Sequence, residues 1–235
     1  MISIHISAQG TGPLVKVEIM KNDHNNAMSG LMSENKPGGK SLIYYTQPGV
    51  EGEIFGMQTA YSTLKAGGTC VFITSSSSPG IIKSQFREIG LDIEQFNKRL
   101  FFVDAYSQLT GEPSREKYVV PAPDNIYNLN NAIISLLLES PPGTFVFGSL
   151  STIMDMCGEN ETIEAVRIWN KLATQHGHTL VYNFTAWPYS REVLNSIKKD
   201  LFNTVICIGG ITKSMISRKY PGIFRSDRMT DNRTA

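Results

Sequence analysis

Short apolar segments alternate with amphipathic, helix-like segments along most of this chain, and this alternation restricts the fold more than any other feature. The expected strands are 41–45, 69–74, 100–104, 144–147, 179–184 and 204–208. The expected helices are 50–65, 81–89, 125–139, 161–176 and 190–199. Because the strands are almost continuously apolar, they are typical of strands buried on both faces. The order predicts an α/β fold with a mostly parallel, twisted sheet and helices on both faces.

The two ends of the chain differ from this repeating pattern. The alternating runs 2–7 and 14–20 predict an N-terminal hairpin, and a polar loop follows it. We expect residues 1–35 to belong to the same domain as a core at 36–226. Segments 212–218 and 223–225 predict antiparallel edge strands, and 227–235 predicts a flexible polar tail.

Composition excludes some classes of protein and leaves others open. No apolar run approaches the ~20 residues of a membrane span, and the N-terminus lacks a basic region typical of a secretion signal. These features predict a cytoplasmic protein with no membrane contact. A net charge of +1 argues against a surface that coats nucleic acid. The C-terminal segment is nevertheless basic and forms a candidate contact patch for a neighbouring subunit or nucleic acid, although a solvated edge is the simpler interpretation; its residues are Lys213, Arg218, Lys219 and Arg225.

The segment between the first core strand and its helix has the frame of a phosphate-binding loop. In the motif G-x-x-x-x-G-K-[S/T], backbone amides and a Lys hold phosphates and the hydroxyl holds magnesium. With Pro48 and Gly49 at the turn, Gly52 falls at the Lys position and Glu53 at the hydroxyl position, with Glu51 beside them. A carboxylate ~5 Å from a phosphate charge repels it by about 3 kcal/mol at an effective dielectric near 20. A simpler interpretation is that both acids are first-turn residues that suit a helix N-terminus.

Several other segments admit a functional and a structural interpretation. Gly39-Lys40-Ser41 matches the end of the same motif, but a strand follows it where the motif requires a helix. His176 and His178 lack further ligands nearby, so a helix-end role is expected and no metal site is predicted. Ser75–Ser78 either line a ligand crevice or form a polar turn, and Trp187–Tyr189 either contact a ligand or subunit or pack under a helix.

Four segments together resemble the RecA-type ATPase core in its KaiC-like and RadA-like archaeal branch. They are Thr46–Gly49 with Gln58, Phe72–Pro79, Leu100–Ser107 and Phe145–Thr152. The resemblance extends in element order over about Lys36 to Ile211, and it implies a RecA-like fold.

The resemblance also implies where the catalytic groups of such ATPases fall in this sequence. The acidic pair after the second core strand falls on Ser76 and Ser77, and a third acid that orders magnesium falls on Gly148. A serine hydroxyl does not act as a general base near neutral pH without an activating group. Together with Gly52 and Glu53, these positions imply a pseudo-ATPase that is not an enzyme and has no cofactor, or binds ATP and magnesium only weakly.

Three functions follow as hypotheses. The first is a regulatory or scaffolding role, through a homo-oligomer or through a hetero-assembly with an active RecA/KaiC-like homologue. The second is a weak sensor of a nucleotide or another small ligand, without hydrolysis. The third is a DNA-associated recombinase paralogue that uses the basic C-terminal patch.

Overall fold

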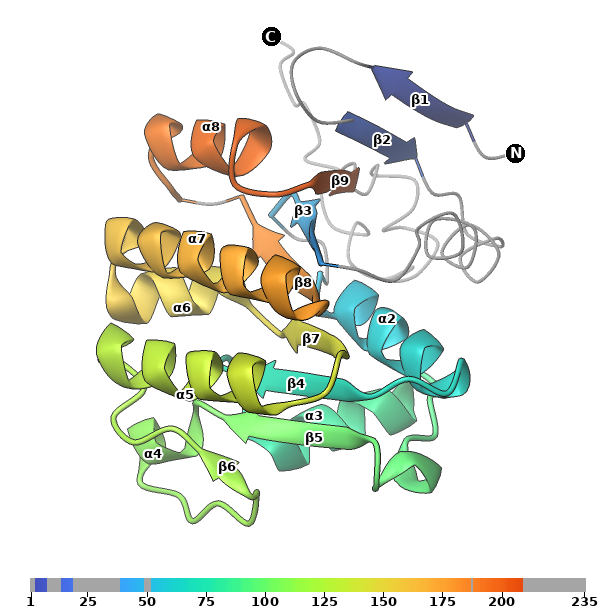
Figure 1. Ribbon diagram of the computed structural model, residues 1–235, viewed down its shortest axis with the longest axis vertical. Helices are drawn as coiled ribbons and strands as arrows, with labels where there is room; N and C mark the ends of the chain where they lie inside the picture. Colours follow the sequence, from blue (N-terminus) through green and yellow to red (C-terminus); the bar gives the residue numbers. More distant parts are fainter. Residues whose placement is uncertain (1–2, 8–13, 19–38, 49–51, 187, 209–235) are drawn as a thin grey trace, which may run out of the picture.

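The computed structural model describes residues 3–7, 14–18, 39–48, 52–186 and 188–208, with the backbone alone for the first two ranges. Within this part of the chain one sheet has the strand order β1-β2-β9-β3-β8-β7-β4-β5-β6 (Figure 1). The strands are β1 (Ser3–Ser7), β2 (Leu14–Glu18), β3 (Lys40–Thr46), β4 (Cys70–Thr74), β5 (Leu100–Asp104), β6 (Tyr118–Val119), β7 (Thr144–Phe147), β8 (Thr179–Thr185) and β9 (Thr204–Ile208). The helices are α2 (Glu53–Lys65), α3 (Pro79–Glu88), α4 (Ser107–Thr110), α5 (Ile126–Glu139), α6 (Leu150–Cys157), α7 (Glu159–His176) and α8 (Arg191–Lys199), with a 3₁₀ turn η1 at Glu94–Phe96.

The described strand pairs are parallel except for β1 and β2, which form the predicted N-terminal hairpin. β2 then joins the hairpin to the core by pairing with β9. In the centre, Lys40 of β3 is opposite Thr179 of β8, and Thr46 is opposite Thr185. The carboxyl ends of these neighbouring strands therefore lie level with each other at one edge of the sheet.

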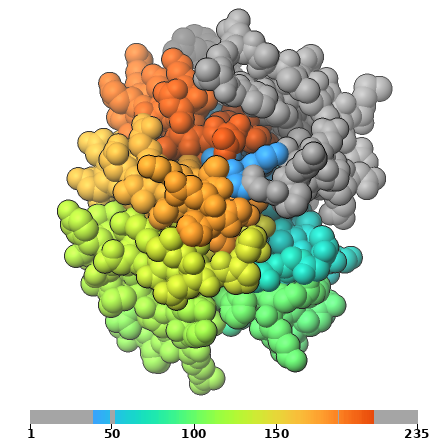
Figure 2. Space-filling view, viewed as in Figure 1, coloured from blue at the N-terminus to red at the C-terminus, as the bar shows by residue number. Residues whose placement is uncertain are grey.

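Helices cover both faces of the sheet, as the apolar strands require. Alternate residues of β3 show the division, because Ile43 and Tyr45 pack with α5 to α8, whereas Tyr44 packs with α2 and α3. On the first face α5 and α7 lie side by side (Figure 1), and their outer surfaces are adjacent in the space-filling view of Figure 2. This arrangement confirms the predicted RecA-like α/β architecture.

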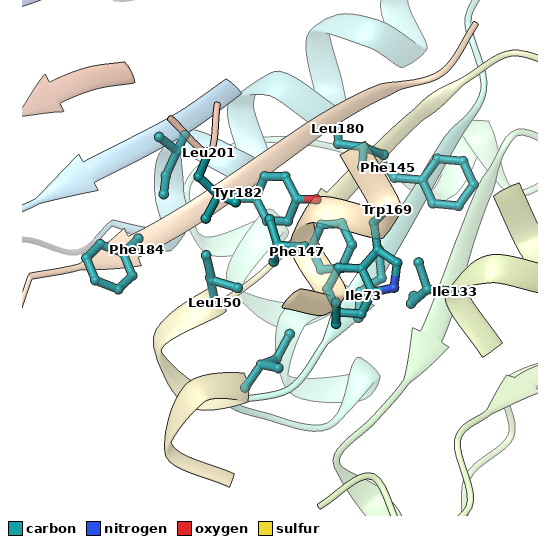
Figure 3. Packing of buried hydrophobic residues seen from close by; sticks show 14 of the residues in the cluster. Ile73, Ile133, Phe145, Phe147, Leu150, Trp169, Leu180, Tyr182, Phe184 and Leu201 are labelled. Atoms are coloured by element: carbon teal, nitrogen blue, oxygen red, sulfur yellow. The ribbon is translucent and has the colours of Figure 1, made fainter. Parts of the chain in front are cut away.

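Aromatic stacking forms the centre of the larger core cluster (Figure 3). The Phe147 ring lies between those of Trp169 and Tyr182, with ring centroids 5.1 and 4.4 Å away. The polar ends of both neighbours are satisfied: Trp169 Nε1 donates to Asn130 Oδ1 at 2.9 Å, and the Tyr182 hydroxyl donates to Asn170 Oδ1 at 3.0 Å. Buried aromatic rings thus link β7, β8 and α7 at no cost in unsatisfied polar groups.

The structure differs from the sequence predictions at several short elements. The sequence analysis did not predict α6, which Ser149 caps by accepting a hydrogen bond from the Thr152 amide. Gly158, with φ of 94°, then separates α6 from α7. The polar stretch 106–124, for which the sequence analysis gave no helix or strand, holds the short elements α4 and β6. The predicted strands at 212–218 and 223–225 and the tail at 227–235 lie outside the described residues.

None of the described helices combines the length and the apolar character needed to cross a membrane.

His178 is a buried histidine with both ring nitrogens hydrogen-bonded. Nδ1 accepts from the Gly143 amide at 3.2 Å, so Nε2 carries the proton and donates to the Leu137 carbonyl at 2.9 Å. Burial is the main cause that holds the pKa of His178 below its ordinary value. His176, by contrast, is the last residue of α7 and is exposed. His178 therefore has a structural role, and His176 lies at a helix end, as the sequence analysis expected.

The neutral state of His178 predicts a specific loss of stability in acid. The unfolded chain takes up a proton at its histidine pKa of about 6.5, whereas folded His178 does so only at lower pH. The stability that neutral His178 contributes to the fold is therefore complete above about pH 6.5. It is lost as the pH falls from there toward the lower pKa of folded His178, by up to about 1.4 kcal/mol per pH unit. We expect urea unfolding to show a shallower pH dependence in His178→Gln, and a smaller change in His176→Gln, because His176 is a lesser cause of the lowered pKa of His178 than burial. Equal pH dependence in all the proteins would contradict this assignment.

Candidate functional site

The carboxyl ends of β3, β4, β7 and β8 meet at one edge of the sheet, where open parallel sheets bind ligands. Thr46 ends β3, Ser75 follows β4, Gly148 follows β7, and Asn183 lies near the end of β8. α2 begins at this edge with Glu53, so its N-terminal amides face the same region. We refer to the space between α2 and these strand ends as the crevice.

The crevice contains a hydrogen bond between two positions that the sequence analysis singled out. Ser76 Oγ donates to Glu53 Oε1 at 2.6 Å, a length typical of a hydroxyl bound to an ionised carboxylate. Burial raises the pKa of the Glu53 carboxyl, and the Ser76 hydrogen bond opposes that rise. The carboxylate of Glu53 is therefore fixed beside the loop after β4, 23 residues away in sequence.

Gly52, at the N-cap of α2, is packed directly against the end of β3. A Cβ added at Gly52 would lie 2.9 Å from Thr46 Oγ1 and 3.1 Å from its Cγ2. The backbone of Gly52 has φ −66° and ψ −28°, which any residue adopts. The position therefore excludes a side chain because of Thr46, which is held by donating a hydrogen bond to the Phe184 carbonyl at 3.0 Å.

Gly148 has a similar constraint at the end of β7. A Cβ at this position would lie 3.1 Å from the Ile73 carbonyl oxygen and 3.2 Å from Cε1 of Phe72. The Gly148 amide donates to the same Ile73 oxygen at 2.9 Å, and Ser75 Oγ donates to the Ser149 carbonyl at 2.9 Å. These bonds hold the ends of β4 and β7 together, so an acidic side chain at 148 requires its neighbours to move.

Asn183 belongs to the crevice although the sequence analysis did not predict it. Its side chain is 3% exposed, and Nδ2 donates to the Phe147 and Gly148 carbonyls at 3.2 Å each. Its Oδ1 has no hydrogen-bond partner in the described part of the structure. A side chain at Gly56 of α2 would overlap the Asn183 amide. A signal was present, because Asn183 interrupts an apolar strand and Gly56 interrupts a helix.

A second polar cluster fixes the connection after β8 above α6. The Tyr189 hydroxyl donates to Asp155 Oδ1 and to the Ser151 carbonyl, at 2.9 Å each. Ser151 Oγ in turn donates to the Thr185 carbonyl at 3.2 Å and accepts from the Thr185 amide at 2.8 Å. Tyr189 is buried, so it packs under the neighbouring elements, as the sequence analysis favoured; Trp187 lies outside the described residues.

The remaining predicted site residues are divided between described and undescribed positions. Pro48 is exposed at the turn after β3, and Ser77 is half-buried beside Ser76. Gly49 and Glu51 lie outside the described residues, and so does the predicted basic patch of Lys213, Arg218, Lys219 and Arg225. Across the described ranges, no group of at least three His, Cys, Asp or Glu side chains is placed to hold a metal ion.

Fold and sequence together define the class of protein. The sequence model of the family described as "ATPase: KaiC" matches residues 35–179, more than half of the chain. The chain therefore belongs to the KaiC family of ATPases. The UPF0273 protein PAE3143 of Pyrobaculum aerophilum is 29% identical over 109 residues, which are 45% of this chain and 39% of that protein. The chain thus matches well under half the length of this relative.

A solved structure supports the same fold. The KaiC-like protein PH0186 from Pyrococcus horikoshii OT3 has a TM-score of 0.53 and 20% sequence identity to this chain. The superposition covers 71% of this chain and 72% of PH0186. The likeness therefore confirms the RecA-like architecture.

The sequence-based expectation that this chain is not an enzyme is wrong. The chain belongs to an ATPase family, and neither the family match nor the relative shows that this chain is inactivated. The error arose because the absence of ATPase groups at a few positions was extended to the activity of the whole protein; these positions are Gly52, Glu53, Ser76, Ser77 and Gly148. Groups at a few loop positions define the local chemistry, whereas a neighbouring subunit can complete a site.

ATP with magnesium is the ligand that the family implies, and its fit can be judged from the residues present. The described crevice offers the amides at the start of α2, but it places the Glu53 carboxylate beside them. The sequence from Thr46 to Glu53 contains no Lys or Arg. An ionised triphosphate therefore does not fit the described part of the crevice while Glu53 is ionised.

The packing at Gly52 predicts that a phosphate-binding lysine needs more than one substitution. We expect Thr46→Ala/Gly52→Lys/Glu53→Thr to bind ADP at least about tenfold more tightly than the unmodified chain, because a cation replaces a repulsive carboxylate. Isothermal titration calorimetry measures this affinity.

Two controls separate the effects of packing and charge. Gly52→Lys/Glu53→Thr retains Thr46 and should be less stable to urea than the triple variant, because its new side chain meets Oγ1. Thr46→Ala alone should lose about 1 kcal/mol with the hydrogen bond to Phe184 and gain no ADP affinity. Equal stability of the double and triple variants would show that Thr46 is not an obstacle.

Proposed function

We propose that this chain is a regulatory or scaffolding member of the KaiC ATPase family that acts through assembly with itself or with a homologue. The observation that carries the proposal is the hydrogen bond from Ser76 Oγ to Glu53 Oε1 at 2.6 Å. It fixes a carboxylate where a nucleotide phosphate would approach α2. The chain by itself therefore binds nucleotide weakly, and an assembly supplies the missing positive charge.

The elements that surround the crevice in the fold support this proposal. The sheet, the helix that starts at the crevice, and the bonds between the ends of β4 and β7 are all in place. Gly52 and Gly148 are packed against Thr46 and Phe72, so the crevice is a well-ordered surface despite its unusual charge. A closely packed crevice with no lysine or arginine among its described residues suits a subunit whose response depends on a partner.

Sedimentation velocity tests the proposal directly. We expect the purified chain to form species heavier than the monomer, alone or mixed with a KaiC-family homologue that has the loop lysine, and the distribution to change when ATP and magnesium are added. The variant Glu192→Gln, which removes an exposed first-turn acid from α8, should behave as the unmodified chain. A monomer under every condition, including the mixture, would exclude this function.

The second candidate function is the sensing of a nucleotide or another small ligand in the same crevice. Asn183 Oδ1 favours it, because this oxygen is buried without a hydrogen-bond partner in the described part of the chain. Leaving such an acceptor unsatisfied costs about 1–3 kcal/mol, part of which a ligand donor can recover.

Thermal denaturation in the presence of different ligands tests the sensing function. We expect the melting temperature to rise with one nucleotide and to stay unchanged with inorganic phosphate, because the base and ribose provide contacts that phosphate lacks. The rise should be smaller in Asn183→Ala after correction for its lower starting stability. Equal rises with all nucleotides and with phosphate would point to general anion binding instead of sensing.

A further inference from the structure

We propose that the crevice takes up one proton on Glu53 when it binds a phosphate, so that nucleotide binding by this chain is linked to pH. The inference rests on the nucleotide-responsive crevice of the proposed function and identifies how that crevice is controlled. It starts from the mismatch between an anionic ligand and the residues present.

The geometry places Glu53 in the path of a phosphate. Its carboxylate is in the first turn of α2, where amide donors attract anions. The Ser76 hydroxyl, fixed on the loop after β4, holds Oε1 at 2.6 Å. Gly52, the residue before it, is packed against Thr46. Rotation of Glu53 out of the crevice breaks its hydrogen bond, whereas protonation leaves the side chain in place.

Besides Glu53, the described residues that border the crevice at the strand ends and in the loop after β4 carry hydroxyl or amide side chains or none. α2 contributes Glu53, and the loop after β4 contributes hydroxyl side chains. β3 ends in a threonine, β7 is followed by a glycine and a serine, and β8 contributes an amide. These bordering residues are Ser76, Ser77, Thr46, Gly148, Ser149 and Asn183. Within the described part of the chain, burial raises the pKa of Glu53 and the hydrogen bond from the Ser76 hydroxyl lowers it.

The proton balance is simple. In the free protein at a pH above the pKa of Glu53, this side chain is a carboxylate that accepts a hydrogen bond from Ser76. On binding, one proton from solvent adds to the carboxylate, which becomes a neutral carboxyl group with one O–H donor. Ser76 still donates to the other oxygen, and the new O–H can donate to a phosphate oxygen. The repulsion between the Glu53 carboxylate and the phosphate is thus replaced by a hydrogen bond between the Glu53 carboxyl group and a phosphate oxygen.

The sign of the linkage follows from the burial of Glu53. Burial raises the pKa of Glu53 in the free protein, and a bound anion favours the neutral carboxyl further. Between these two pKa values binding takes up a proton, so phosphate affinity rises as the pH falls. For a single proton the change is about tenfold per pH unit.

Calorimetric titration with ADP tests this linkage on the full chain. Titrations from about pH 5.5 to about pH 8 in buffers of different ionisation enthalpy give the number of protons taken up on binding. ADP also titrates in this range, so the informative quantity is the difference between the unmodified chain and Glu53→Gln. We expect that difference to be about one proton.

The variants give matched expectations. At about pH 8, Glu53→Gln should bind ADP at least about tenfold more tightly than the unmodified chain, and the two affinities should converge in acid. Ser76→Ala removes the hydroxyl that stabilises the carboxylate and should move the pH dependence to higher pH. Glu192→Gln removes a first-turn acid from α8 instead, and should match the unmodified chain. Glu53→Thr provides a second test if Glu53→Gln folds poorly.

Several results would overturn the inference. They are equal proton uptake in the unmodified chain and Glu53→Gln, weaker binding by both Glu53 variants, or no ADP binding by any protein at any pH. Neutralisation by magnesium in place of a proton, seen as metal-dependent affinity without proton uptake, would also overturn it. Sedimentation measures assembly separately, so a failed linkage with intact assembly leaves the proposed function standing.

Discussion

Burial of a parallel sheet on both faces is the constraint on which the rest of this structure depends. Tyr44 and Tyr45 are neighbours on β3, yet both are almost fully buried, because α2 covers one face and α5 to α8 cover the other. Such a sheet has no polar face. Polar chemistry is therefore confined to the ends of the strands, and the connections there bring together Thr46, Ser76 and Asn183.

The sequence was informative wherever a long apolar pattern determined the structure. β3, β4 and β7 could be predicted because continuous apolar residues in a short segment have few alternatives to a buried strand. α6 could not, since Leu150–Cys157 is short and begins with a serine cap that also resembles a loop. The contact between Gly56 and Asn183 could not be predicted either, because it depends on how a helix lies across a strand far away in sequence.

At the candidate site, the sequence indicated which positions matter but not how their side chains interact. The loop motif singled out Glu53 and the family resemblance singled out Ser76, but only the folded chain shows that Ser76 donates a hydrogen bond to Glu53. The mistaken inference about enzymatic activity came from a different step. The side chains at a few positions were used to infer the activity of a whole protein. The charge at a crevice also depends on protonation and on adjoining chains. The charge on Glu53 therefore depends on pH and on the groups around it, and it cannot be read from the sequence alone.

The close packing around Gly52 and Gly148 has a consequence for how such a crevice changes over generations. A substitution that adds a side chain at Gly52 meets Thr46, and one at Gly148 meets Phe72 and the backbone of Ile73. The neighbours must shift to admit either side chain, so the stability cost of each substitution depends on the residues around it. Compensating substitutions at these neighbours would therefore decide how readily either glycine is replaced.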